Sequence, residues 1–335
     1  MQQHKVSIFI PFRDTVHFLP ECLDSILVQS HRNWEVLAVD DHSGDQSADL
    51  LESYAKRDSR IRVFPNGGRG IIPALRTAYA QGTGAFVSRM DSDDIMKGNR
   101  MEAMLGSLVE HGPGHLAVGQ VQYFSHRGIS DGYRRYQQWL NRLTSKGDNF
   151  KEIYKECVIP SPCWMAHRSD FEACGGFGPD RYPEDYDLAF RFYEKRLKVI
   201  PSNEVLHLWR DYDSRTSRTH VHYAQNHFLE LKLHYFLLLD RDVGRPLVLW
   251  GAGFKGKFLA AGLQKRGVDF YWICDNPRKI GKKIHGKELL HFGALEGLDR
   301  PQSVVTVANE TSQREIRAHF EALGQRPVED YFFFC

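Results

Sequence analysis

Cysteine is scarce in this sequence and follows no pattern. The six cysteines are scattered over 335 residues, and none forms a CxxC pair with another. This distribution argues against both a disulfide framework and a zinc site. We therefore expect reduced, mostly buried thiols in a cytoplasmic protein.

Long apolar runs and a strong net charge are also missing. The longest candidate run, residues 235–239, is far shorter than the ~20 residues of a membrane-spanning helix. The chain enters a strand-like stretch directly after residue 5, so we expect no signal peptide. Association with the inner face of a membrane remains compatible with the sequence. A net charge of +2 gives no reason to expect nucleic acid as a partner.

The length of the chain predicts about two domains. Strand and helix patterns alternate in the first half, which indicates a parallel α/β sheet. The expected strands cover residues 6–10, 34–39, 61–64 and 85–90, and the expected helices cover 19–27, 43–54 and 72–81.

The pattern changes after residue 101. We expect a helix, one strand over residues 116–124, and then a polar, loop-rich region over 132–177. A helix over 184–195 and a long helix over 223–239 follow. Gly244-Arg245-Pro246 interrupts the chain. The sequence thus predicts a first domain over 1–220, a helical linker over 221–244 and a second α/β domain over 245–335.

Polar residues follow three of the first four expected strands. These are Arg13-Asp14, Asp40-Asp41 and the acidic run Asp91-Ser92-Asp93-Asp94. Ligands of open α/β sheets bind beyond the carboxyl ends of the strands. Crowded carboxylates suit a hard divalent cation, and Mg²⁺ binds through one or two carboxylates plus substrate phosphates. An acidic run alone could equally cap a surface turn, but a second acidic strand end favours a metal and phosphate site.

Several motifs, in order along the first ~240 residues, resemble family 2 glycosyltransferases, which have the GT-A fold. No single motif is specific, but the ordered set is. The motifs are Ile10-Pro11-Phe12-Arg13-Asp14, Cys22-Leu23-Asp24-Ser25-Ile26-Leu27, Val39-Asp40-Asp41-His42-Ser43-Gly44-Asp45, Asn66-Gly67-Gly68, Arg89-Met90-Asp91-Ser92-Asp93-Asp94 and Glu184-Asp185.

The resemblance implies roles for these residues. The nucleotide-sugar would contact Asp40 and Asp41, assisted by Pro11, Arg13, Asn66 and Ser92. Asp91 would lie near the ribose, and Asp93, with Asp91, would hold Mg²⁺ or Mn²⁺ on the two phosphates. Asp185 would be the general base that deprotonates the acceptor hydroxyl, and Glu184 would support it. Single displacement would invert the anomeric configuration.

Two regions allow a second interpretation. Glu184 and Asp185 could simply begin a helix, where acidic side chains favour the positive end of its dipole. Arg210, Arg215 and Arg218 resemble a closing loop whose cations would meet the diphosphate. Many relatives have a histidine in this loop, but Tyr212 stands at that place here, so a histidine metal ligand is not expected.

The second domain contains Gly251, Gly253 and Gly256 in a GxGxxG pattern after an expected strand, with Asp275 19 residues further on. This context fits a dinucleotide fingerprint, and the domain resembles small Rossmann-like domains appended to bacterial sugar-modifying enzymes. The glycines could instead serve only strand–helix packing, which we favour slightly. An NAD(P)-binding oxidoreductase is therefore an alternative function, and a non-catalytic nucleotide-binding scaffold is another.

The leading prediction is an inverting glycosyltransferase of bacterial polysaccharide or glycoconjugate assembly. Its donor would be a nucleotide-sugar, most often UDP-linked in relatives. Its acceptor would be a glycan or a lipid-linked saccharide. The sequence does not indicate the sugar, the linkage or the oligomeric state.

Overall fold

A computed structural model describes residues 3–213 and 225–335. The chain divides into two compact units. The first comprises Met1–Asn149 and Val158–Thr219, and the second comprises Phe150–Cys157 and His220–Cys335. Within the described residues, no helix is both long and apolar enough to cross a bilayer.

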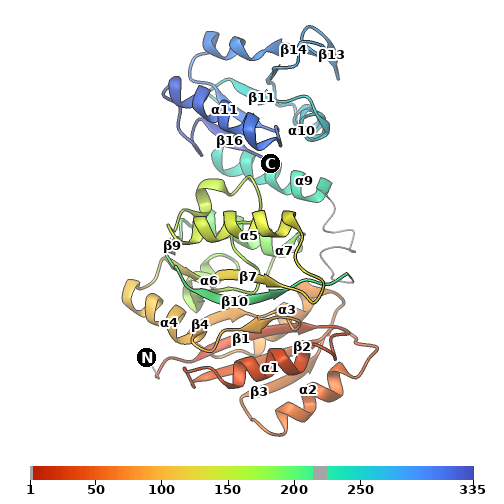
Figure 1. The fold of residues 1–335 in the computed structure, drawn as a ribbon, viewed down its shortest axis with the longest axis vertical. Coiled ribbons are helices and arrows are strands. Elements are labelled where there is room, and N and C mark those ends of the chain that lie inside the picture. Colours follow the sequence, from red (N-terminus) through yellow and green to blue (C-terminus); the bar gives the residue numbers. More distant parts are fainter. Residues whose placement is uncertain (1–2, 214–224) are drawn as a thin grey trace. The chain divides into compact units, whose positions relative to one another are not determined.

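The first unit is a mixed α/β structure (Figure 1). Its strands are β1 (Val6–Phe12), β2 (Trp34–Asp40), β3 (Ile61–Pro65), β4 (Phe86–Arg89), β5 (Ile95–Met96), β6 (His115–Val118), β7 (Gln120–Phe124), β8 (Trp164–His167), β9 (Lys198–Ile200) and β10 (Val205–Arg210). Its helices are α1 (Leu19–Leu27), α2 (Ser47–Ala55), α3 (Ile71–Gln81), α4 (Arg100–His111), α5 (Asp131–Thr144), α6 (Arg168–Ala173) and α7 (Glu184–Glu194).

Seven strands form the main sheet of this unit, in the order β3-β2-β1-β4-β8-β6-β9. β3, β2, β1 and β4 are parallel, whereas β8 runs antiparallel to both β4 and β6. A second sheet has the order β5-β10-β7. The parallel strands bring the segments after β1, β2, β3 and β4 to one edge, which is where the acidic residues were predicted to gather.

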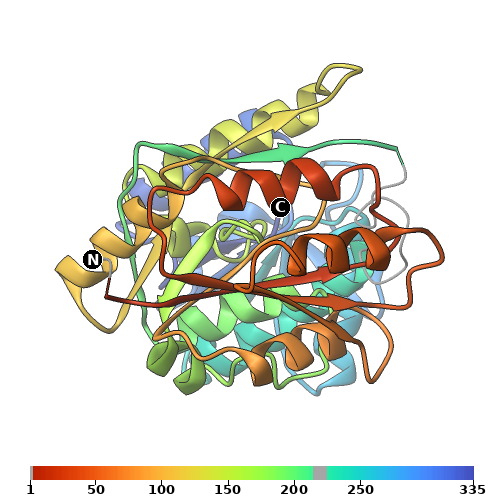
Figure 2. The same ribbon diagram turned by 90° about the horizontal axis from the view of Figure 1, so that it is seen from below.

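Helices cover both faces of the main sheet. Val6, Ile8 and Ile10 point into a core that includes residues of α1, α2 and α4. The alternate residue Phe9 packs edge-on against Tyr79 of α3. Figure 2 shows α1 and α2 on one side of the strands and α3 on the other. This two-sided burial explains why β1 is apolar along nearly its whole length.

Three local predictions were wrong. The helix expected from residue 43 begins at Ser47, because Asp40 and Asp14 hold residues 43 and 44 in a loop. The strand expected over 116–124 is two strands in different sheets. They separate at Gly119, where a Cβ atom would lie 2.7 Å from Leu206 Cβ. Part of the expected loop region over 132–177 is the helix α5.

The second unit is another α/β structure. Its sheet has the order β13-β14-β12-β11-β15-β16, with all neighbours parallel except β13 and β14. Its elements are α9 (Gln225–Tyr235), the π-helix η3 (Phe236–Asp240), β11 (Leu247–Trp250), α10 (Phe254–Lys265), β12 (Tyr271–Cys274), β13 (Lys283–Ile284), β14 (Lys287–His291), η4 (Phe292–Gly297), β15 (Gln302–Val305), α11 (Glu310–Ala322) and β16 (Tyr331–Phe333). A further short 3₁₀ helix, η1 (Asn149–Glu152), spans the point where the chain leaves the first unit.

Candidate active site

Asp41 organises the loop that follows β3. Its Oδ1 accepts hydrogen bonds from Asn66 Nδ2 at 2.7 Å and from the Gly70 amide at 2.8 Å. Asn66 also donates to the Gly70 carbonyl at 3.1 Å. Gly70 has a φ of +96°, a conformation that side chains disfavour. Asp41 and Asn66 are therefore fixed together at the carboxyl edge of the sheet, although they come from different strands.

Asp40 and Asp14 hold the neighbouring turn. Asp40 Oδ1 accepts from the Ser43 amide at 2.9 Å and from Ser43 Oγ at 2.6 Å. Asp14 Oδ1 accepts from the Gly44 amide at 2.6 Å. Arg13, just beyond Pro11 in β1, is exposed and lies 3.4 Å from Asp14. The Asp40 oxygen bonded to Ser43 therefore shapes the loop of the predicted nucleotide site.

Arg89 joins the acidic run to the start of α7. This buried guanidinium donates through Nε to Asp91 Oδ1 at 3.0 Å and through Nη1 to Glu184 Oε1 at 3.0 Å. Its Nη2 lies 2.9 Å from the same oxygen of Asp91. Arg89 thus connects the acidic run to Glu184, 95 positions further along the chain. The sequence motif contained Arg89 but gave no indication of this contact.

Asp185 is half-buried beside this bridge. Burial and the Glu184 carboxylate together raise the pKa of its carboxyl group to about 7, against the opposing charge of the Arg89 guanidinium. The pKa of Tyr182 is also raised, by burial and by the charges of Glu184, Asp180 and Asp41. The carboxylates that the sequence placed on separate strands and on α7 therefore share one electrostatic environment.

Tyr212 and Arg210 contact Asp93. Tyr212 donates its hydroxyl to Asp93 Oδ2 at 2.8 Å, and Arg210 Nε donates to the Asp93 carbonyl at 2.6 Å. Arg210 was predicted in a closing loop, but it is the buried last residue of β10 and forms an ion pair with Glu21. Arg215 and Arg218 lie outside the described residues. A groove of about 770 Å³ opens beside Arg210 and Tyr212.

A series of buried hydrogen bonds connects Asp94 of the acidic run to β10 and α4. Asp94 accepts from the Arg210 amide at 2.7 Å and contacts His207 Nε2 at 3.0 Å. His207 Nδ1 lies 3.0 Å from Arg100 Nη1. Because arginine can only donate, Nδ1 accepts and the imidazole proton lies on Nε2, directed at Asp94. His207 is thus a fully buried link between β10 and the acidic run.

The comparison with known families decides the identity of the first unit. The model of the family described as "Glycosyl transferase family 2" matches residues 7–175, half of the chain.

The chain belongs to glycosyl transferase family 2.

One relative of this family 2 glycosyltransferase is "Uncharacterized glycosyltransferase EpsJ" of Bacillus subtilis. The two are 37% identical over 214 residues, which is 62% of this chain and 61% of EpsJ. Some relatives are much longer, since this chain covers 27% of an uncharacterized glycosyltransferase of Rickettsia felis.

Solved structures share the fold. S. aureus TarS 1–349, in complex with UDP-GlcNAc, has a TM-score of 0.54 at 20% identity, over 78% of this chain and 72% of TarS. The mannosyltransferase PcManGT of Pyrobaculum calidifontis, in complex with GDP-Man and Mn²⁺, has a TM-score of 0.50 at 19% identity, over 77% of this chain and 69% of that one. The predicted α/β class and GT-A fold are confirmed.

The residues around Asp93 fit a cation that is bound mainly by its substrate. Among the residues that the structure describes, no three histidine, cysteine or acidic side chains are grouped to hold a metal ion. However, burial and the charges of Asp94, Asp93 and Asp91 raise the pKa of the Cys22 thiol, so negative charge is concentrated there. One or two carboxylates plus substrate phosphates are the usual Mg²⁺ environment.

The side chain of Asp187, two residues beyond the predicted base, is not part of this cluster. It is almost fully buried and paired with Arg191 Nε at 2.8 Å and Arg181 Nη1 at 3.1 Å. Arg191 also donates to the carbonyls of Cys174 and Gly176. Asp187 therefore holds the preceding loop against α7, while Asp185 on the same helix lies beside Glu184 and Arg89.

The glycine loop predicted to bind a dinucleotide belongs to the second unit. Gly251 has a φ of +115°, and a Cβ on Gly256 would lie 2.1 Å from the Gly251 carbonyl oxygen. Both glycines are thus required by the close packing of β11 against α10. A Cβ on Gly253 would meet nothing within 4 Å, and Asp275 is exposed after β12. Nucleotide binding by this loop stays a prediction.

Proposed function

We propose that this chain transfers a sugar from a nucleoside diphosphate donor to a hydroxyl group of a glycan or lipid-linked saccharide, with inversion at the anomeric carbon. One observation carries the proposal. Arg89 joins Asp91 of the acidic run to Glu184, the neighbour of Asp185. This bridge would keep the predicted donor residues close to the predicted base, as a single displacement requires.

The nucleotide would lie against the loops that Asp40 and Asp41 organise. Asn66 and Gly70 are tied to Asp41, so the binding surface is formed before the donor arrives. TarS carries UDP-GlcNAc and PcManGT carries GDP-Man, and both donors are nucleoside diphosphate sugars. For this chain we propose a UDP-sugar. With a lipid-linked acceptor, transfer would take place at the inner face of the membrane.

Asp93 and Asp91 would hold Mg²⁺ or Mn²⁺, as the complex of PcManGT with Mn²⁺ supports. When bound, the cation neutralises charge on the departing diphosphate. Tyr212 orients Asp93 through the hydrogen bond to Oδ2, and Arg89 orients Asp91. The buried contact of His207 with Asp94 would fix the backbone of the run beneath the diphosphate.

Asp185 would take the proton of the acceptor hydroxyl. As the acceptor oxygen forms its bond to the anomeric carbon, the bond from that carbon to the diphosphate oxygen breaks, and the proton passes to the Asp185 carboxylate. A pKa of about 7 makes this carboxylate a stronger base than an ordinary aspartate while leaving much of it ionised near neutral pH. Attack from the face opposite the leaving group inverts the anomeric configuration.

The proposal is tested by measuring nucleoside diphosphate release and thermal stabilisation with a panel of UDP- and GDP-sugars plus Mn²⁺. We expect one donor to stabilise the protein and to release its nucleoside diphosphate when an acceptor is added. NAD⁺ serves as the comparison ligand. Stabilisation by NAD⁺ alone, with no response to any nucleotide-sugar and Mn²⁺, would contradict the proposal and favour the oxidoreductase alternative.

A further inference from the structure

A basic groove lies at the amino-terminal ends of β1, β2 and β3. Its volume is about 370 Å³, and its lining comprises Lys5, Arg32, Asn33, Trp34, Glu35, Ser59, Arg60, Arg62 and Thr83. The acidic residues of the predicted donor site follow the opposite ends of the same strands. A seven-residue strand such as β1 spans about 20 Å, so the groove and the predicted donor site are separate places on the first unit.

The charge of the lining is one-sided. Four cationic side chains, those of Lys5, Arg32, Arg60 and Arg62, line the groove with one carboxylate, that of Glu35. One further carboxylate, that of Asp58, pairs with Arg60 from outside the lining. Four cations against two carboxylates leave excess positive charge in a concave site, which attracts anions.

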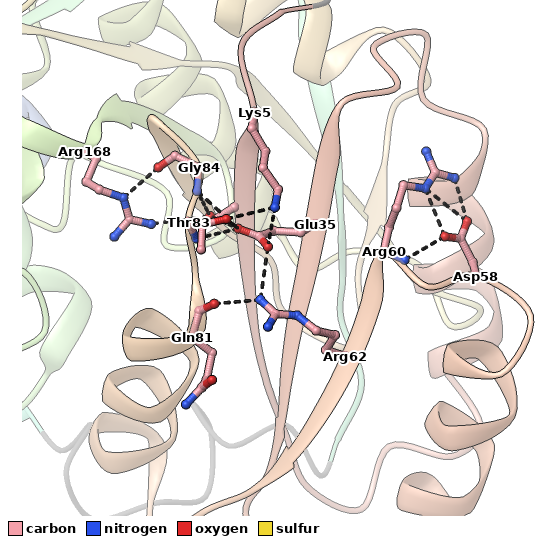
Figure 3. A network of polar contacts seen from close by, with 10 residues as sticks. Lys5, Glu35, Asp58, Arg60, Arg62, Gln81, Thr83, Gly84 and Arg168 are labelled. Atoms are coloured by element: carbon pink, nitrogen blue, oxygen red, sulfur yellow. Dashed lines mark hydrogen bonds and ion pairs between the residues drawn. The ribbon is translucent and has the colours of Figure 1, made fainter.

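Glu35 is the anchor of this arrangement (Figure 3). Its Oε2 lies 2.8 Å from Lys5 Nζ and 3.1 Å from Arg62 Nη2, so one oxygen serves two cations. Its Oε1 accepts from Ser7 Oγ at 2.8 Å and from the Thr83 amide at 2.6 Å. Burial alone would raise the pKa of Glu35, but hydrogen bonds from Lys5, Thr83 and Ser7 lower it to about 2. Glu35 therefore stays ionised and holds both cations in place.

Arg60 is fixed in a different way. Its guanidinium lies 3.7 Å above the Trp34 ring and donates to Asp58 and to the Arg32 carbonyl. The side chains of Lys5, Arg60 and Arg62 are nevertheless 38%, 33% and 40% exposed. The cations are thus held by buried anchors and remain open to solvent, so an anion could bind without first ordering them.

We propose that this groove binds a phosphate group, from a small phosphorylated molecule or from a lipid headgroup. Phosphate fits because its oxygens accept several hydrogen bonds at once and because arginine suits their geometry. Arg60 directly precedes β3 and Arg62 is its second residue, so the two arginines flank Ile61, and Lys5 is joined to Arg62 through Glu35. The binding of this anion is independent of the proposed sugar transfer.

Pyrophosphate titration in metal-free buffer, followed by calorimetry, tests the proposal. We expect the wild type to bind and the double variant Arg60→Gln/Arg62→Gln to bind at least about tenfold more weakly, because charged hydrogen bonds are lost. The matched control is Lys195→Gln/Lys198→Gln, which removes the same charge from exposed positions elsewhere on this unit and should bind as the wild type does. Equal weakening in both double variants, or no weakening in the first, would overturn the proposal.

Two further measurements keep the test decisive. Arg32→Gln removes an exposed cation of the groove, so it tests the same claim if the double variant fails to fold, and unchanged pyrophosphate affinity there would contradict it. Co-sedimentation with phosphatidylcholine vesicles, with and without phosphatidylglycerol, separates the two sources of phosphate. Binding to the anionic vesicles that is lost in Arg60→Gln/Arg62→Gln supports a lipid headgroup. Pyrophosphate binding without vesicle binding supports a small molecule.

Discussion

At the two ends of the main sheet lie carboxylates whose pKa values move in opposite directions. At the amino end, hydrogen bonds from Lys5, Thr83 and Ser7 overcome burial and lower the pKa of Glu35 to about 2. At the carboxyl end, burial and the Glu184 carboxylate raise the pKa of Asp185 to about 7, against the opposing charge of Arg89.

This difference distinguishes a carboxylate with a structural role from one with a proposed catalytic role. A carboxylate that stays ionised over the whole physiological range can anchor cations but cannot exchange a proton usefully. A carboxylate that titrates near neutral pH can act as a general base. Changes at the carboxyl end should therefore reduce turnover with little loss of stability, and changes to Glu35 should do the reverse.

The largest expected effect is that of Asp185→Asn on turnover. We expect kcat to fall by about a hundred- to ten-thousand-fold, the usual contribution of a general base, while the donor affinity and the free energy of unfolding are kept. Initial rates and donor titration measure both. Glu194→Gln, an exposed change on the same helix, is the control and should leave kcat unchanged. Normal turnover in Asp185→Asn would show that the base is another residue.

Glu35→Gln should instead act on stability. We expect the free energy of unfolding to fall by about 3 kcal/mol, because the change removes a buried charge that is paired with two cations. Turnover per folded molecule should stay the same. Denaturant unfolding measures the loss, with Glu52→Gln, an exposed glutamate of α2, as the control. A stable Glu35→Gln protein would mean that the Glu35 network contributes little to the fold.

The Glu35 network also predicts a pH dependence of stability. Because the pKa of Glu35 falls from 4.5 to about 2 on folding, its contribution is complete above pH 4.5 and is lost as the pH decreases towards 2. The free energy of unfolding of the wild type should decrease in this window, and that of Glu35→Gln should decrease less. Parallel slopes for the two proteins would exclude Glu35 as the source.

The titration of Asp185 should be visible in the kinetics. Below a midpoint near 7, kcat/KM should fall about tenfold for each pH unit, since only the ionised carboxylate accepts a proton. The pH profile of kcat/KM measures this directly. A flat profile from pH 5 to pH 8 would be inconsistent with Asp185 as the base.

Tyr212→Phe should have the smallest effect. Asp93 loses one hydrogen bond of 2.8 Å, which is worth about 1 kcal/mol. We expect a roughly fivefold increase in the Mn²⁺ concentration for half-maximal rate, with kcat nearly unchanged. Tyr271→Phe on β12, at an exposed tyrosine of the second unit, provides a matched hydroxyl deletion. An unchanged Mn²⁺ requirement in Tyr212→Phe would show that the tyrosine does not orient Asp93.

The sequence was sufficient for the parallel part of the sheet, because β1, β2, β3 and β4 are apolar runs that end in polar residues. It also indicated Asp41, Asn66 and Asp91 through local motifs. The α5 helix was missed because its composition is polar, although Tyr133, Tyr136, Leu140 and Leu143 recur at helical spacing. The split at Gly119 depends on contact with Leu206, which no local pattern reveals.

The contacts that complete the candidate site join distant residues. Arg89 and Glu184 are 95 positions apart, Asp93 and Tyr212 are 119 apart, and Arg100 and His207 are 107 apart. For Arg89 and His207, the only sequence signal of a role was a charged or polar side chain within an otherwise apolar strand. The basic groove likewise needs three strands to be side by side, so its residues could not be grouped from the sequence.

The most direct test of the central claim is a crystal structure with a UDP-sugar and Mn²⁺ bound. The account predicts an anomalous Mn²⁺ peak beside Asp93 and Asp91, the nucleoside against Asp41 and Asn66, and the anomeric carbon open to attack from the side of Asp185. A donor bound at the Gly251–Gly256 loop, or a cation away from the acidic run, would contradict it.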